Sequence, residues 1–305
     1  MTSYLVAMAT IAAIYALLAL SLNVMWGMTG MVNLGLTGFY AVGAYASALL
    51  TVRLGLPVVI GFAAAMALTA AVAALTTFGL LRLRDDYLAI VTLGFAEVVR
   101  IAGENEIWLT NGTDGISRIP QPLHQALGAA DFNLFYLGLC LAVLAIVLVL
   151  LERIRRSPFG RALRAIREDS QVAAIAGKNV LAFKVKAFAL GGLIAGLAGA
   201  LYGHYTSYIV PELFQPLLTI YIFLAVTAGG RGNNWGAAIG AYVVVFFLES
   251  TRFLTGVLPW LSAVQIAAMR ELLVGLGLLV VLHCRPEGLM PEPLPRLGPR
   301  RGAAS

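Results

Sequence analysis

Long apolar stretches without a single charge dominate the pattern of hydrophobic and polar positions. These charge-free runs cover residues 1–52, 54–81, 132–151, 187–211, 213–230, 232–248 and 253–269. A helix rises about 1.5 Å per residue, so about 20 apolar residues cross the ~30 Å hydrocarbon core of a bilayer. Each run can therefore hold one or two transmembrane helices.

Helix-breaking residues divide these runs into candidate membrane helices. They lie at residues 4–25, 31–52, 57–81, 87–103, 132–151, 184–205, 214–230, 235–253 and 262–283. The pattern predicts an all-α, polytopic membrane protein with eight or nine transmembrane helices. The doubtful segment is the second, because glycines at 27, 30, 35, 38 and 43 bracket or interrupt it. It either spans the membrane or is a re-entrant or broken N-terminal segment, which leaves the side of the N-terminus open.

Composition supports a membrane protein and argues against an enzyme. Of the 305 residues 60% are hydrophobic and 12% charged, and the mean hydropathy is +0.87, which excludes an ordinary soluble domain. The two cysteines form no disulfide scaffold, and the three histidines stand far apart, so we expect no metal, no cofactor and no catalytic residues. The sequence contains no phosphate-binding Gly-x-x-x-x-Gly-Lys-Ser/Thr loop, so if ATP hydrolysis supplies the energy, a partner must carry it out.

The distribution of Lys and Arg predicts the orientation. Residues 152–186 hold nine basic against three acidic residues, which places this loop in the cytoplasm. Residues 104–131 hold four acidic residues against Arg118 and belong on the outside. Residues 1–283 form one domain, and residues 284–305, with five of the twelve prolines, are expected to be a disordered cytoplasmic tail.

Charged residues near the ends of the spans come in close pairs. Glu97 with Arg100, and Glu249 with Arg252, have the i,i+3 spacing at which two charges neutralise each other on one helix face. We interpret them as structural ion pairs rather than transport groups. A lone carboxylate in mid-membrane, as a proton-coupled carrier needs, is not evident, which weakens that alternative without removing it.

The second segment combines glycines with polar side chains. Asn23, Thr29, Asn33 and Thr37 accompany Gly35, and polar groups beside unwound backbone are how transporters build binding sites. A substrate pathway and tight packing explain this pattern equally well.

The basic loop predicts two short helices. Ser157-Pro158 is a typical start, and Phe159, Leu163 and Ile166 then form one apolar stripe. A second helix begins at Asp169 and ends at Gly177. The pair lies either on the anionic inner leaflet or in a groove on a soluble subunit.

Several sequence blocks, in one order, resemble a known family. They are Leu22-Asn23 through Gly43-Ala44-Tyr45, LRDDYLAIVTLGFAE at 83–97, LTNGTDGI at 109–116, SPFGRALRAIRED at 157–169, AGLAGALY at 195–202, and GGRG at 229–232 with Gly236 and Gly240. The chain resembles, from Leu20 to about Glu249, the LivM-type permease subunit of branched-chain amino acid ABC importers.

The resemblance implies a multi-pass permease of the bacterial inner membrane that binds no nucleic acid. Its expected partners are the lipid bilayer, a homologous LivH-type permease subunit, two ABC ATPase subunits and a periplasmic solute-binding protein. The residues implied in ATPase coupling are Arg161, Leu163, Arg164, Ile166, Arg167, Glu168, Asp169, Ala173, Ala174 and Gly177. The solute is a branched-chain amino acid or, as in related permeases, urea, an amide or another small molecule. A secondary carrier or channel that works alone is the alternative from another class.

Overall fold

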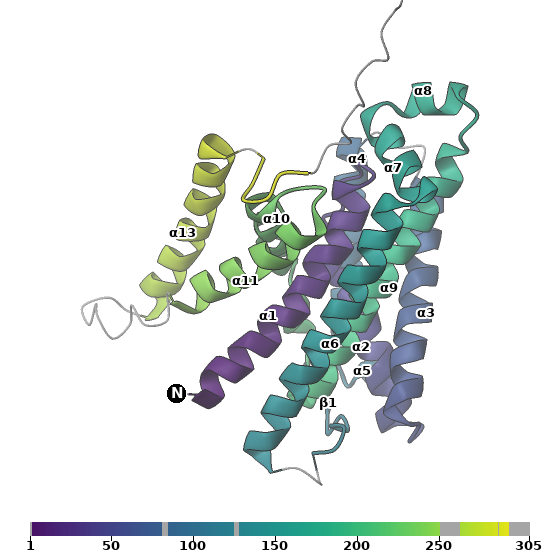
Figure 1. The fold of residues 1–305 in the computed structure, drawn as a ribbon. Helices are drawn as coiled ribbons and strands as arrows, with labels where there is room; N and C mark the ends of the chain where they lie inside the picture. The colour runs from purple at the N-terminus through teal and green to yellow at the C-terminus, as the bar shows by residue number, and fades with distance from the viewer. Residues whose placement is uncertain (1, 81–84, 125–127, 251–262, 286, 293–305) are drawn as a thin grey trace, which may run out of the picture.

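The computed structural model describes residues 2–80, 85–124, 128–250, 263–285 and 287–292 (Figure 1). Its helices are α1 Thr2–Leu22, α2 Leu36–Val52, α3 Val58–Leu80, α4 Asp85–Asn105, α5 Ile107–Thr110, α6 Ala129–Arg156, α7 Pro158–Glu168, α8 Ser170–Ile175, α9 Val180–Thr206, α10 Pro216–Gly229, α11 Asn234–Ser250 and α13 Ala263–Cys284. A π-helical turn, η1 Asn23–Gly27, extends α1, and two 3-10 turns are η2 Gly112–Asp114 and η3 Pro211–Phe214. The strands β1 Ile116–Ser117 and β2 Tyr208–Ile209 pair antiparallel.

The predicted all-α fold is confirmed for the described residues. Five segments are long and apolar enough to cross a membrane: Ser3–Gly27, Val58–Gly79, Asp131–Arg156, Val180–Thr206 and Pro211–Gly229. α2 and α11 are apolar but shorter, at 17 residues each. The expected eight or nine crossings therefore stay a prediction.

The doubtful second segment is a broken one. Residues 28–35 are irregular, and the helix begins only at Leu36. Before the break, the Gly27 carbonyl accepts a hydrogen bond from Arg167 of α7; after α2, Arg53 donates to the Trp108 carbonyl of α5 at 2.6 Å. Because α7 and α5 lie at opposite ends of the molecule (Figure 1), residues 28–52 pass from one end to the other.

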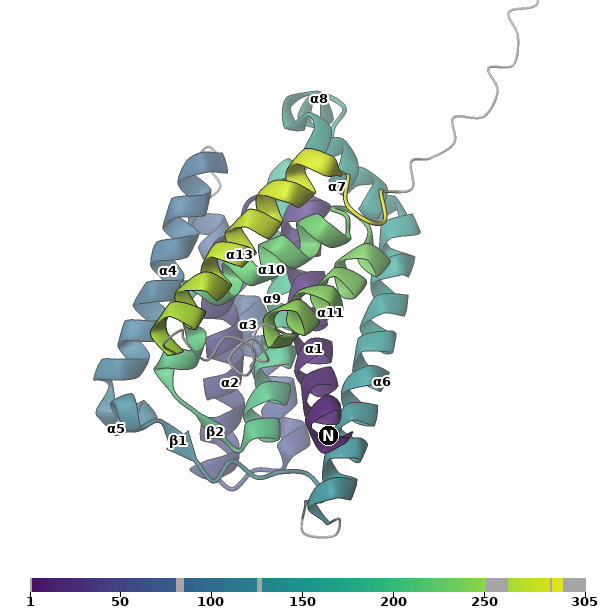
Figure 2. The ribbon, with the colours of Figure 1, turned by 90° about the vertical axis from the view of Figure 1, so that its left-hand side faces the viewer.

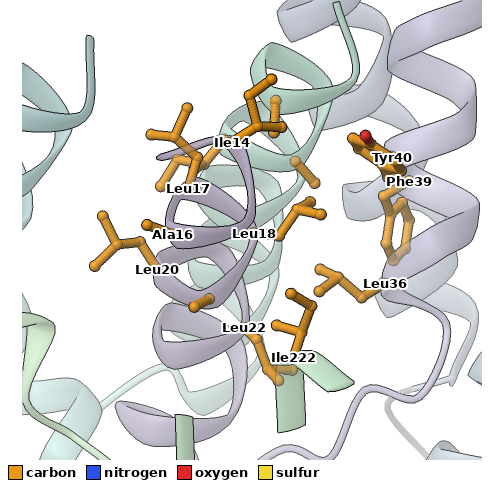
Figure 3. Packing of buried hydrophobic residues seen from close by; sticks show 14 of the residues in the cluster. Ile14, Ala16, Leu17, Leu18, Leu20, Leu22, Leu36, Phe39, Tyr40 and Ile222 are labelled. Carbon is orange, nitrogen blue, oxygen red and sulfur yellow. The ribbon is translucent and has the colours of Figure 1, made fainter. Parts of the chain in front are cut away.

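The core is built around α1, which runs between α10 and α11 on one side and α6 and α9 on the other (Figures 1 and 2). Leu17, Leu18 and Leu22 of α1 are buried with Phe39 of α2 and Ile222 of α10 in one apolar cluster, whose packing is shown in Figure 3. Because α1 is apolar around its whole circumference, it is suited to this central position.

Small residues let α9 approach its neighbours closely. A methyl group at Gly199 would lie 2.2 Å from the Tyr40 carbonyl oxygen of α2, and one at Gly192 would lie 2.8 Å from the Thr69 carbonyl oxygen of α3. Both distances are too short for any side chain. The sequence pattern of small residues in α9 is therefore explained by backbone contact between helices.

The two loops of opposite charge lie at opposite ends of the molecule. α7 and α8, from the basic loop, form one end, whereas α5 and β1, from the acidic loop, form the other (Figures 1 and 2). This arrangement is what the charge pattern requires. Which end faces the cytoplasm stays a prediction.

The start of the C-terminal tail differs from the expected disorder. Leu289 and Met290 donate backbone hydrogen bonds of 2.8 and 2.9 Å to the carbonyls of Ala228 and Gly229 at the end of α10. Expecting disorder from residue 284 onward was therefore wrong for residues 287–292, because the last carbonyls of a helix need donors and this segment supplies them. Residues 293–305 lie outside the described residues.

Candidate functional site at the basic loop

The ends of both loop helices follow from local sequence. The Ser157 hydroxyl accepts from the Gly160 N–H at 3.3 Å, with Pro158 in the first turn of α7. One Asp169 carboxylate oxygen accepts from the N–H groups of Gln171 and Val172 at 2.8 and 3.0 Å, which starts α8. Gly177, at φ +75°, follows its end. The two predicted helices are confirmed.

The apolar stripe of α7 faces the protein itself. Leu163 and Ile166 are buried within this chain, and Phe159 stacks on Phe183 of α9 with ring centroids 5.4 Å apart. The two alternatives weighed from sequence, lipid or a groove on a partner, were both wrong for this stripe. α7 packs against α6 and α9, and the ends of those helices already supply the apolar surface that the stripe needs.

The outer surface of the loop is shared by α7, α8 and the residues that follow α8. Of the residues expected to couple to an ATPase, those exposed are Arg161, Glu168, Asp169, Ala174 and Gly177, whereas Ala173 is buried. Sequence reasoning missed two large apolar side chains here, Val172 and Ile175, which are 61% and 87% exposed. A six-residue helix is too short to show a periodic stripe, so only the exposure of its apolar residues in the fold reveals this surface.

Two arginines of α7 point inward. Arg167 donates through Nη1 to the Gly27 carbonyl at 2.5 Å and through Nη2 to a Glu292 carboxylate oxygen at 2.7 Å. Arg164 lies 3.9 Å from the other oxygen of Glu292. The three side chains are only 15–17% exposed. α7 is thereby joined both to the end of the first membrane segment and to the C-terminal segment.

Asn23 joins the same end of the first membrane segment to the turn between α10 and α11. Its side-chain oxygen accepts from the Gly232 N–H at 2.8 Å, and its amide nitrogen donates to the Asn234 side-chain oxygen at 3.0 Å. Arg231 of this turn lies over the ring of Trp26, 4.8 Å from its centre. Partial burial, together with the charge of Arg167, lowers the pKa of Arg231 from its usual range, while Glu292 opposes that effect.

The other candidate pathway residues are buried and hydrogen-bonded inside the chain. Asn33 donates to the Met25 sulfur at 2.9 Å and accepts from the Gly35 N–H at 2.9 Å. The Thr29 hydroxyl donates to the Met25 carbonyl, and the Thr37 hydroxyl accepts from Thr219 at 3.3 Å. Their role in the pathway stays a prediction. Thr29 also borders, together with Gly30 and Arg167, a cavity of about 500 Å³ beside α7.

A cavity of about 510 Å³ lies toward the opposite end, bordered by α1, α9, α10, α11 and α13. Its polar lining comprises Tyr15, Tyr202, Tyr221, Glu212, Gln215, Glu249 and Glu271, and its apolar lining includes Leu217 and Leu218. This volume is typical of sites for small ligands. The cavity therefore offers space for a small solute.

The Glu97–Arg100 ion pair is present, with both carboxylate oxygens 3.0 Å from the arginine Nε, and Glu104 binds the same guanidinium. For the second expected pair, Arg252 lies outside the described residues. Glu249 accepts a hydrogen bond of 2.6 Å from the Tyr4 hydroxyl.

A serine and a histidine meet inside the helix bundle, but not as a catalytic site. The Ser47 hydroxyl lies 2.8 Å from Nε2 of His204, whose Nδ1 lies 2.7 Å from the Pro120 carbonyl oxygen. Ser47 and His204 are completely buried, so no substrate reaches the hydroxyl. We interpret the pair as a polar link between α2 and α9.

A bundle of membrane-length apolar helices with a compact, capped, basic loop at one end defines a polytopic membrane protein. The profile of the family described as "Branched-chain amino acid transport system / permease component" matches residues 4–282. The chain belongs to this family.

Curated relatives agree with the family. The chain is 34% identical to the high-affinity branched-chain amino acid transport system permease protein LivM of Escherichia coli K12, over 97% of this chain and 72% of the relative. It is 28% identical to the probable LivM of Methanocaldococcus jannaschii, over 92% and 91%. It is 25% identical to the permease protein LivH of Salmonella typhimurium, over 93% of each chain. No solved structure matches the chain.

Proposed function

We propose that this chain is the permease subunit of an ATP-driven importer in the bacterial inner membrane and forms part of the translocation pathway for branched-chain amino acids or a similar small solute. The partners proposed with it are a LivH-type permease, two ABC ATPase subunits and a periplasmic solute-binding protein. ATP hydrolysis is assigned to the ATPase subunits because the chain has no phosphate-binding loop of its own. The relatives named LivM and LivH support the pairing of two homologous permeases.

The observation that carries this proposal is the exposed apolar surface of α8. Val172 and Ile175 project from the end of the molecule, next to a helix, α7, that is firmly packed onto the membrane bundle. Such a projection suits a groove on a soluble partner. Force applied to α8 would reach the end of the first membrane segment, next to the irregular residues 28–35, through α7 and the contact between Arg167 and Gly27.

Replacing Ile175 with Asp tests this contact. The side chain is exposed, so the variant should insert and fold normally, but solute-stimulated ATP hydrolysis in the reconstituted complex should fall and the ATPase subunits should co-purify less. Ile107→Asp is the matched control, because Ile107 is 69% exposed at the opposite end of the molecule. Full binding and stimulation in Ile175→Asp would overturn the assignment of α8.

Two further variants separate the candidate solute paths. Leu217→Trp narrows the cavity, whereas Asn33→Leu changes the irregular segment. We expect Leu217→Trp to reduce uptake if the solute crosses the cavity, and Asn33→Leu to reduce it if residues 28–37 open onto the path. Assembly with the partners is measured in parallel. Unchanged uptake in Asn33→Leu would leave the segment with a packing role alone.

The class of transporter is tested by reconstitution. Uptake by this chain alone in liposomes, driven by an ion gradient, would support a secondary carrier or channel and refute the importer. Uptake that requires ATP and the further subunits supports the importer. Competition among leucine, urea and small amides in the complete system then identifies the solute.

A further inference from the structure

The segment of residues 287–292 attaches to the body like a short strand. Besides the hydrogen bonds from Leu289 and Met290 to the end of α10, Asn233 donates to the Pro291 carbonyl at 3.2 Å. Gly230, at φ +125°, has no room for a side chain, because a methyl group there would lie 2.0 Å from the Met290 carbonyl oxygen. The turn after α10 is therefore shaped to receive this segment.

Glu292, at the end of this segment, lies among positive charges. Its carboxylate accepts from Arg167 at 2.7 Å and lies 3.9 Å from Arg164. Gly232 leaves the room for it, because a methyl group there would lie 2.7 Å from the carboxylate and 3.1 Å from the Arg167 guanidinium. The carboxylate thus lies where α7, the α10–α11 turn and the end of the chain's first membrane segment meet.

We propose that residues 287–292 form a brace that fastens α7 to the membrane bundle, with Glu292 as a positioning residue that acts through Arg167. Glu292 binds Nη2 of Arg167, so that Nη1 stays hydrogen-bonded to the Gly27 carbonyl. Motion of α7 then moves the start of the irregular segment. The brace itself is a property of this chain, and its effect on transport rests on the proposed function.

The charges explain why one carboxylate has this effect. Removing it leaves Arg164, Arg167 and Arg231 close together without the acid that binds the first two. Like charges held in a largely buried place repel, and a guanidinium that loses one of its two hydrogen-bond partners is less firmly fixed in direction. α7 would then keep its apolar packing while losing its polar connection to Gly27.

Hydrogen exchange tests the brace without reference to transport. In the purified chain in nanodiscs, the amides of Leu289 and Met290 should exchange slowly, and Glu292→Ala should speed exchange in the peptides that cover 287–292 and 28–35. Glu292→Asp should restore part of the protection, because it retains a carboxylate. Glu287→Ala is the control, since Glu287 is exposed in the same segment. Equal exchange in Glu292→Ala and Glu287→Ala would overturn the brace.

The complete reconstituted system then tests the transport effect. In Glu292→Ala we expect solute uptake per ATP hydrolysed to fall about fivefold or more, the usual lower range for coupling between sites, while the ATPase subunits remain bound. Uptake per ATP equal to that of Glu287→Ala, despite faster exchange, would overturn the positioning role. If the wild-type chain shows a protected brace but transports without ATP or partners, the proposed function fails while the brace stands.

Discussion

The replacement Asn23→Ala should measure how strongly the end of the first membrane segment is attached to the α10–α11 turn. Asn23 is completely buried, and its side chain makes two hydrogen bonds, of 2.8 Å from the Gly232 N–H and 3.0 Å to the Asn234 oxygen. Alanine leaves both partners unsatisfied. A buried polar group without a partner costs about 1–3 kcal/mol, so the two together cost about 2–6 kcal/mol. Entry of water into the small space left behind reduces this to the lower half of the range.

The assay is thermal unfolding of the detergent-solubilised chain, followed by the loss of its monodisperse peak. A chain of this size loses about 2 °C of melting temperature per kcal/mol, so we expect a decrease of roughly 5 °C. Asn105→Ala is the matched control, because Asn105 is exposed and hydrogen-bonds only within its own helix, to the Ile101 carbonyl. If Asn23→Ala melts at the same temperature as Asn105→Ala, the two buried hydrogen bonds do not stabilise this junction, and the reasoning is refuted.

Three further predictions concern the same end of the molecule and its orientation. Leu163→Ala should destabilise the chain by about 2–5 kcal/mol, because the side chain is fully buried; a normal melting temperature would contradict the inward-facing stripe. Gly230→Ala should detach residues 287–292 and speed exchange of their amides, because the added methyl group meets the Met290 carbonyl; unchanged exchange would show that the turn can adapt. In a chain without Cys140 and Cys284, Thr113→Cys should react with an impermeant thiol reagent in intact cells and Arg161→Cys only after permeabilisation; the reverse pattern would invert the orientation.

Hydropathy predicted the helices well because membrane segments are long and nearly uniform. The segment expected at 57–81 is α3, Val58–Leu80, and that expected at 184–205 lies within α9, Val180–Thr206. The helix starts at Ser157 and Asp169 were equally predictable from the sequence, because a capping side chain accepts a hydrogen bond from backbone only two or three residues away. Features of this kind depend on neighbours in sequence.

The direction of side chains was harder to predict, because it depends on partners far along the chain. Arg164 and Arg167 lie off the apolar stripe of α7, and their charge pointed to lipid headgroups or a partner. They turn inward because they pair with Glu292. This partner lies 125 residues beyond Arg167, so the local sequence does not reveal it. The same separation explains why the sequence could not show what holds the Asn23 side chain: its partners, Gly232 and Asn234, are more than 200 residues away. The role of Asn23 in a solute path stays a prediction.

Four distant stretches of sequence thus meet at the predicted cytoplasmic end: residues 23–30, α7, the α10–α11 turn and residues 287–292. Their contacts are polar and directional, whereas the packing of α1 deeper in the bundle, such as that of Leu18 with its neighbours, is apolar. An apolar contact tolerates sliding, but a hydrogen bond to a fixed carbonyl does not. A loop that transmits motion to the end of the first membrane segment therefore needs a directional contact such as the hydrogen bond from Arg167 to the Gly27 carbonyl. It also needs a second group that binds the Arg167 side chain and fixes its direction. The position of Glu292 satisfies that requirement.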